Sequence, residues 1–247
     1  MHMNKDLDYN IRGIDLTLKS KMLSQEGAKV RDSLIAKISE LEQQLRLFQD
    51  SIIHCNKQIE EYHKLEIEVP ENKSVYCDKI VAFENNRYIW NLSGFITLLS
   101  IDIKTLQIGL YFSENEWQKR HYARYACTLM YEGVDDIFEL IGKDFKTLLS
   151  TDSYKVLNGS LLISLRTKLN EFKKDYCPLF RNIRNNAFAH MDHDVASQVK
   201  TICEINWSDT IQALQLFEGI INDMGVFMKQ LIDLGRKQLE SVYSHNE

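Results

Sequence analysis

A run of apolar residues at alternating spacings of four and three dominates the first third of the chain. The run comprises Leu34, Ile38, Leu41, Leu45, Phe48, Ile52, Cys55, Ile59 and Tyr62. This spacing places all of these side chains on one side of an α-helix and therefore predicts a long helix. Two packings fit the pattern. The helix either forms a coiled coil with a second copy of the chain or packs within its own chain, because bundles use the same side-chain interlocking.

Helical patterns continue through the rest of the sequence. A second 4-3-4-3-4 stripe consists of Leu92, Ile96, Leu99, Ile103, Leu106 and Leu110. The chain of 247 residues holds only two prolines and ten glycines, so helices are rarely interrupted. No stretch alternates with the period of two that strands require. We therefore predict an all-α fold, a helical bundle with a long N-terminal heptad-patterned helix.

Breaks in these patterns divide the chain. The charged segment 64–73 contains Pro70 and predicts a linker, which separates an N-terminal helical arm (1–75) from a helical bundle (76–247). A further helix is expected from about residue 116 to 149, with an interruption near Gly133. Pro178 is expected to open a new helix, since proline is tolerated at a first helical position. A short helix is then expected up to about Glu204, followed by a last long helix.

Composition narrows the possible environments and partners. Apolar residues make up 44% and charged residues 26%, as in ordinary globular proteins. No apolar run approaches the ~20 residues of a membrane span, and no secretory signal is visible. We expect a cytoplasmic protein without a membrane partner. The five cysteines show no C-x-x-C pair and are expected to be reduced thiols. A net charge of −5 disfavours indiscriminate nucleic-acid binding but allows a local basic cleft.

The segment 181–194, with sequence RNIRNNAFAHMDHD, is the most chemically dense part of the chain. Arg184 can fork onto phosphate oxygens, and His190 titrates near neutral pH and can transfer protons. On a regular α-helix, six residues turn the chain by about 600°, so these two side chains would lie roughly 120° apart. One phosphate is then reached by both only if the helix bends or a second copy supplies the other half across a two-fold axis.

This segment also resembles a known family. Arg184-Asn185, followed by four residues and His190, resembles the Arg-x(4–6)-His signature of the HEPN superfamily, and the Ala-His-x-Asp ending is similar to its abortive-infection and toxin-like branch. The resemblance implies a helical bundle that acts as a homodimeric, metal-independent endoribonuclease and needs no cofactor. It assigns phosphate binding to Arg184, proton transfer to His190 and a supporting role to Asn185.

Basic residues near the motif extend the predicted RNA contact. Between residues 166 and 184 there are six basic residues against two acidic ones. We expect Arg181 and Lys174 to contact RNA phosphates, joined by Arg120 and Arg124 if their helix packs alongside. A solvated helix face would show the same charge pattern.

Other functions also fit the sequence. Many HEPN proteins lack catalysis, so the alternative is a non-catalytic module that binds RNA, a nucleotide, or a partner such as an antitoxin or a nucleotidyltransferase. A third hypothesis is a structural protein assembled through the 34–62 helix. A metal site at His190, Asp192, His193 and Asp194 would resemble an HD-type phosphohydrolase. The additional His and Asp of that family cannot be placed, so no metal is predicted.

Overall fold

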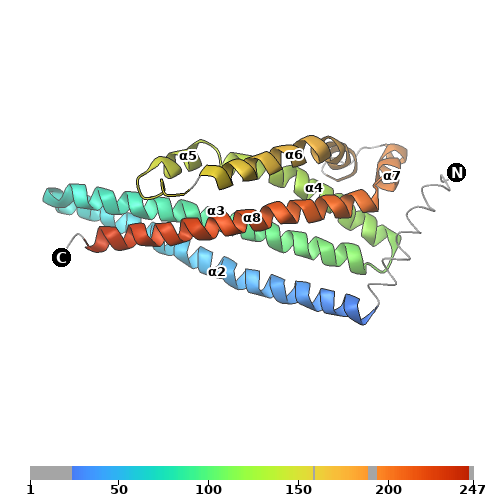
Figure 1. Ribbon diagram of the computed structural model, residues 1–247, viewed down its shortest axis with the longest axis horizontal. Coiled ribbons are helices and arrows are strands. Elements are labelled where there is room, and N and C mark those ends of the chain that lie inside the picture. The colour runs from blue at the N-terminus through green and yellow to red at the C-terminus, as the bar shows by residue number, and fades with distance from the viewer. Residues whose placement is uncertain (1–23, 158, 189–193, 245–247) are drawn as a thin grey trace. The chain divides into compact units, whose positions relative to one another are not determined.

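The structure is a computed structural model that describes residues 24–157, 159–188 and 194–244 (Figure 1). These residues form helices and no strand, which confirms the predicted all-α helical bundle. In chain order the elements are α2 (Gln25–Glu68), the 3₁₀ helix η1 (Pro70–Asn72), α3 (Lys73–Phe112), α4 (Glu116–Leu140), α5 (Lys143–Ser150), α6 (Gly159–Ile183), the π-helical turn η2 (Arg184–Phe188), α7 (Val195–Cys203) and α8 (Trp207–Ser244).

The heptad stripe lies on α2, which runs for 44 residues without a break. Four of its members are buried within the chain and the other five are half-buried. Leu47 and Ile53, which lie off the stripe, are 64% and 58% exposed. Cys55, Ile59 and Tyr62 pack against α3 in one apolar cluster. The chain's own helices therefore cover the stripe, as expected for a helix packed within its own chain.

The described residues group into two compact units. The first comprises the described residues within the segments Met1–Glu40, Leu99–Ile137 and Arg166–Ile220, and the second those within Leu41–Leu98, Phe138–Leu165 and Ile221–Glu247. Residue 75 lies just after η1, close to the predicted linker. Each unit nevertheless draws residues from both sides of that position. The division into 1–75 and 76–247 stays a prediction.

The core of the first unit is rich in aromatic rings. Phe172 of α6 lies 5.2 Å from Phe217 of α8, between ring centroids. Gly133 is buried beside Phe217, and a Cβ atom there would come within 3.2 Å of that ring. α4 continues through Gly133, so the predicted interruption at this glycine is wrong. Its missing side chain allows close packing, and the break falls instead at Gly142, just before α5.

The core of the second unit is held together by rings and by buried polar contacts. Phe145 of α5 lies edge-on to Phe227 of α8 at 6.0 Å. The Asn86 amide donates to the carbonyl oxygens of Ala82 and Gly235 at 2.9 and 3.1 Å. A Cβ atom at Gly235 would lie 2.5 Å from the Asn86 Oδ1 atom, so α3 and α8 approach closely at this glycine.

Pro178 lies inside α6 and does not open a new helix. The prediction of a helix start at this proline is wrong. Proline removes one helical hydrogen bond, here to the carbonyl of Lys174. Both residues are exposed, so water can replace the lost donor, while Cys177 and Phe180 on the same helix remain buried in the core. The burial of these neighbours keeps the helix continuous.

Only the stretch Pro70–Phe112 is long and apolar enough, among the described helices, to cross a membrane by length and composition. Half of its most apolar window is buried inside the chain. Within it, Lys104 and Gln107 are buried and both donate to Glu218 of α8. These contacts between charged and polar groups belong to a protein core.

All five cysteines are free thiols. Burial raises the pKa of Cys55 and Cys177 to about 11 and that of Cys127 to about 12. Thiols with raised pKa values hold little thiolate at neutral pH and are weak nucleophiles.

Candidate functional site

Arg184 stands where α6 changes its helical geometry. The α-helix ends at Ile183, which is buried, and η2 continues the chain as a π-helical turn with i→i+5 hydrogen bonding. Asparagine is a weak helix former because its side chain competes for hydrogen bonds, and here Asn186 Nδ2 donates to Asn182 Oδ1 at 2.7 Å. The 120° separation calculated for a regular α-helix therefore does not apply after Arg184. His190 lies outside the described residues.

The Arg184 guanidinium is held by three contacts. Its Nε donates to Glu132 Oε1 at 2.5 Å, and its Nη1 donates to Asn185 Oδ1 at 3.1 Å. Its Cζ atom lies 6.0 Å from the ring centroid of Tyr131. The side chains of Arg184 and Glu132 are 31% and 42% exposed, so the ion pair faces solvent. These hydrogen bonds use two of the five N–H donors of the guanidinium, and the remaining ones can meet an anion.

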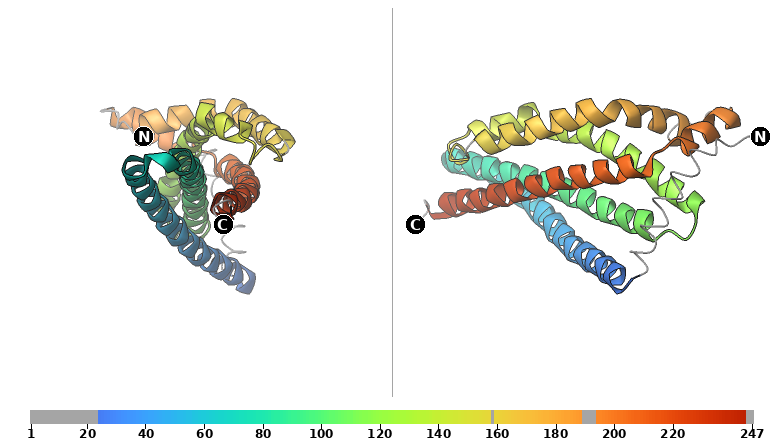
Figure 2. Two further views of the ribbon diagram at one scale, coloured as in Figure 1. Left: turned by 90° about the vertical axis from the view of Figure 1, so that its left-hand side faces the viewer. Right: turned by 45° about the vertical axis from the view of Figure 1, so that its right-hand side comes forward.

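Glu132 and Tyr131 were not predicted as site residues. They lie on α4, 52 residues before Arg184 in the case of Glu132, and no spacing rule connects them to the motif. A second carboxylate of α4, Asp135, accepts from Lys173 Nζ of α6 at 2.5 Å. This hydrogen bond raises the pKa of Lys173. In the first unit α4 lies beside α6 and η2 (Figure 2). The Lys173–Asp135 ion pair joins α4 to α6, and the Arg184–Glu132 ion pair joins α4 to η2.

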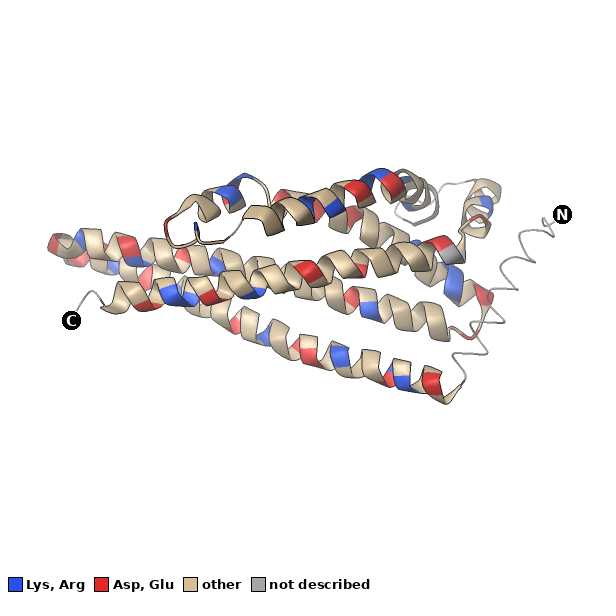
Figure 3. Ribbon diagram, viewed as in Figure 1, with Lys and Arg blue, Asp and Glu red and all other residues tan. Residues whose placement is uncertain are grey.

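The predicted phosphate-binding residues fall into different environments. Lys174 and Arg181 are exposed and lie seven residues apart on α6, hence on the same side and ~10 Å apart. Arg120 is buried, and its Nη1 donates to the carbonyl oxygen of Ile202 at the end of α7 at 3.1 Å. This hydrogen bond gives Arg120 a structural role. Along the sequence of α6, Glu171 and Asp175 stand among the basic residues (Figure 3).

Arg124 is half-buried on α4 and lies beside an exposed ring. Its Cζ atom is 6.0 Å from the ring centroid of Trp117. Its Nε donates to the Arg120 carbonyl oxygen at 3.4 Å. Burial lowers the pKa of Arg124 because desolvation disfavours the charged guanidinium. A partly desolvated cation next to an aromatic ring is suited to an anionic ligand that can stack.

α7 completes the surroundings of the motif. Asp194 caps α7 by accepting from the Ala196 backbone N–H at 3.0 Å. The helix contacts η2, and Arg120 ties its end to α4. No group of three or more His, Cys, Asp or Glu within the described ranges could hold a metal ion. The other three residues of the metal site considered from the sequence, His190, Asp192 and His193, lie outside the described residues.

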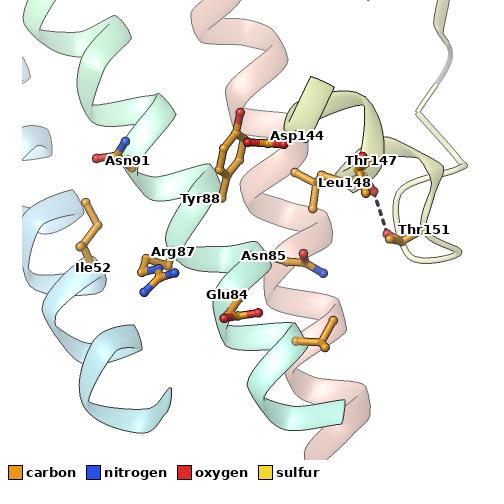
Figure 4. A pocket seen from close by; sticks show the side chains of 11 residues that line it. Ile52, Glu84, Asn85, Arg87, Tyr88, Asn91, Asp144, Thr147, Leu148 and Thr151 are labelled. Atoms are coloured by element: carbon orange, nitrogen blue, oxygen red, sulfur yellow. Dashed lines mark hydrogen bonds between the residues drawn. The ribbon is translucent and has the colours of Figure 1, made fainter. Parts of the chain in front are cut away.

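The second unit contains a separate cavity of about 720 Å³ between α2, α3 and α5 (Figure 4). It is lined by Ile52, Val81, Glu84, Asn85, Arg87, Tyr88, Asn91, Asp144, Thr147, Leu148 and Thr151. None of the predicted site residues takes part. The Nδ2 atom of Asn85 is buried without a hydrogen-bond partner among the described residues. The cavity has the size of a small-ligand site, but its charged groups are of both signs and do not select one class of ligand.

Comparisons with protein-family models, with curated proteins and with solved structures gave no match for this chain. The resemblance to HEPN proteins therefore rests on the motif around Arg184 and on the helical fold.

Proposed function

We propose that the chain is a metal-independent endoribonuclease of the HEPN toxin or phage-defence type, acting in the cytoplasm as a homodimer. The observation that carries the proposal is the presentation of Arg184. The residue stands on a π-helical turn, a geometry frequent at functional sites, and its guanidinium is partly exposed while Glu132 and Asn185 fix its orientation.

The proposed chemistry needs few groups. One group must take the 2′-hydroxyl proton, one must protonate the leaving 5′-oxygen, and a cation must stabilise the charged phosphorane. Arg184 would bind the phosphate through the N–H groups that Glu132 and Asn185 do not use. Asn185 supports this orientation. His190 would transfer the protons, and a second copy across a two-fold axis would supply the partner groups.

Cleavage of mixed cellular RNA in EDTA tests the activity and its residues together. We expect the wild type to leave cyclic-phosphate ends and the Arg184→Ala/His190→Ala variant to lose at least about 100-fold in rate. A matched variant, Arg46→Ala/His63→Ala, removes an exposed arginine and an exposed histidine from α2 and should cleave like the wild type. Equal cleavage by the wild type and the Arg184→Ala/His190→Ala variant would assign the activity to another site or to a contaminant.

Mixing the two single variants tests the composite dimeric site. Arg184→Ala and His190→Ala should each be inactive alone. A mixture that exchanges subunits contains heterodimers in which one cleft keeps an intact arginine from one chain and an intact histidine from the other. Partial recovery of cleavage is the expected result, and its absence despite subunit exchange would place both residues of one site in a single chain.

The ion pair between Arg184 and Glu132 favours the second candidate, a non-catalytic module that binds RNA, a nucleotide or a partner such as an antitoxin or nucleotidyltransferase. The Glu132 carboxylate binds one edge of the Arg184 guanidinium, as in an ion pair with a structural role. This alternative predicts that neither the wild type nor the His190→Ala variant cleaves RNA, and a module whose ligand is RNA should bind it equally well in both forms.

A further inference from the structure

One side of α4 in the first unit carries aromatic and basic side chains at helical spacing. Its members are Trp117, His121, Arg124, Tyr125, Thr128 and Tyr131, here called the α4 outer face. Steps of three and four residues place them on one side of the helix. Trp117 is 58% exposed and Tyr125 is 39% exposed. Large aromatic side chains are usually well buried, so two exposed rings on one face indicate a binding surface.

A guanidinium group stands over a ring at each end of the α4 outer face. Arg124 lies over Trp117, and Arg184 lies over Tyr131, both at 6.0 Å from the guanidinium carbon to the ring centroid. From residue 117 to residue 131 the helix rises by about 21 Å. The face therefore leads along α4 from an exposed tryptophan to the arginine of the motif.

The composition of the face selects between possible partners. Its six members include no aliphatic residue and no carboxylate. Two carboxylates lie on the same side of the helix farther along, Glu132 and Asp135, and they are paired with Arg184 and Lys173. Protein–protein interfaces also favour aromatic residues and arginine, but their buried centre is predominantly apolar, and this face offers no aliphatic side chain to such a centre. Single-stranded RNA instead stacks its bases on aromatic rings and guanidinium planes and pairs its phosphates with cations. Double-stranded RNA is recognised through its 2′-hydroxyls and phosphates and offers no free base to such rings.

We propose that the α4 outer face binds single-stranded RNA, with bases stacked on Trp117, Tyr125 and Tyr131 and phosphates contacted by Arg124 and Arg184. The inference rests on the proposed function, because it names the form of RNA that the motif would receive. At about 3.4 Å per stacked nucleotide, a face of this length holds about six nucleotides. The strand would pass along α4 and reach the guanidinium of Arg184 at one end.

Binding of a fluorescein-labelled 2′-O-methyl oligouridine of twelve nucleotides, measured by anisotropy in EDTA, tests the proposal. The blocked 2′-hydroxyl prevents cleavage. We expect Trp117→Ala and Tyr125→Ala each to weaken binding by about fivefold or more, whereas Trp117→Phe, which keeps a ring, stays within about twofold of the wild type. Tyr243→Ala removes a ring of similar exposure from α8 and should bind like the wild type.

Two further readings sharpen the test. Affinity should rise with oligonucleotide length up to about six nucleotides and then level off, and a duplex should bind more weakly than either of its strands. Bound RNA should quench tryptophan fluorescence in the wild type, and Trp117→Phe should remove most of this quenching while retaining affinity. Loss of quenching without loss of binding would show direct stacking on Trp117.

Several outcomes would overturn the proposal: no binding by the wild type, binding unaffected by Trp117→Ala, or equal affinity for duplex. If Trp117→Ala dissociates a dimer in sedimentation while oligonucleotide binding is unchanged, the face is a protein contact. The test is independent of cleavage. If the wild type cuts no RNA but binds it through Trp117, the ribonuclease proposal is wrong and the binding face stands. If cleavage depends on Arg184 but Trp117→Ala has no effect on binding, the binding face is wrong and the ribonuclease proposal stands.

Discussion

Burial of Asp102 on α3 raises the pKa of its carboxyl above the ordinary value of 3.8. Desolvation disfavours the carboxylate form, so the folded state holds this proton more tightly than the unfolded state does. Between the unfolded and folded pKa values, the folded state binds more protons, and stability falls as pH rises. At neutral pH the ionised Asp102 therefore lowers the stability of the fold, and below the unfolded pKa this effect disappears.

Replacing Asp102 by asparagine should stabilise the protein at pH 7. The gain over the wild type should shrink as pH is lowered through the raised pKa and vanish below about pH 3.8, where the wild-type carboxyl is protonated in both states. Urea unfolding at a series of pH values measures this. Asp152→Asn is the matched control. A hydrogen bond from Lys155 lowers the pKa of Asp152, so this substitution should lower stability at pH 7 instead of raising it. A pH-independent gain for Asp102→Asn would contradict the assignment to ionisation.

At the scale of a single helix, glycines differ in how much free space lies where a Cβ atom would be. Gly219 and Gly225 lie inside α8, are exposed, and have no atom within 4 Å of the position that a Cβ would take. A glycine in a helix interior costs about 0.5–1 kcal/mol relative to alanine because it loses more backbone freedom on folding. Gly109 of α3 differs, since a Cβ there would lie 2.5 Å from the ring of Tyr122.

Alanine substitutions should therefore have opposite effects. Gly219→Ala and Gly225→Ala should each raise the free energy of unfolding by about 0.5–1 kcal/mol, and together they should add because no contact couples them. Gly109→Ala should lower it by about 1–3 kcal/mol, because the Tyr122 ring must move. Denaturant titration of the three variants against the wild type measures these changes. A stabilising Gly109→Ala would mean that Tyr122 does not pack over this glycine.

The helices themselves could be predicted from local spacing, whereas their breaks and the partners of the motif could not. The stripes on α2 and α3 follow from a repeat within one segment. Gly133 and Pro178 favour breaks by intrinsic preference, but packing against Phe217 and burial of neighbours on α6 kept both helices continuous. Glu132 contacts Arg184 only because the fold brings α4 beside η2.

Across the whole molecule, α2 contributes residues to both compact units. In the second unit, Cys55, Ile59 and Tyr62 of α2 cover Ile80 and Phe83 of α3 in one apolar cluster. Burial of each large apolar side chain in such a core stabilises the folded state by ~1.5–3 kcal/mol. If α2 served only to join two copies of the chain, the apolar side chains of α3 would be buried by other helices even when α2 is absent.

Removal of residues 1–72 tests whether the segment before residue 75 is a separable arm. We expect the remaining 73–247 chain to lose its cooperative thermal transition and to bind a hydrophobic dye, because Ile80 and Phe83 would be uncovered. A double variant of full length, Leu47→Ser/Ile53→Ser, alters only exposed residues off the stripe and should keep the wild-type melting temperature and oligomeric state. If instead 73–247 folds cooperatively as a monomer, α2 is an assembly arm; if it folds as a dimer, the two-fold interface lies in the bundle that carries Arg184.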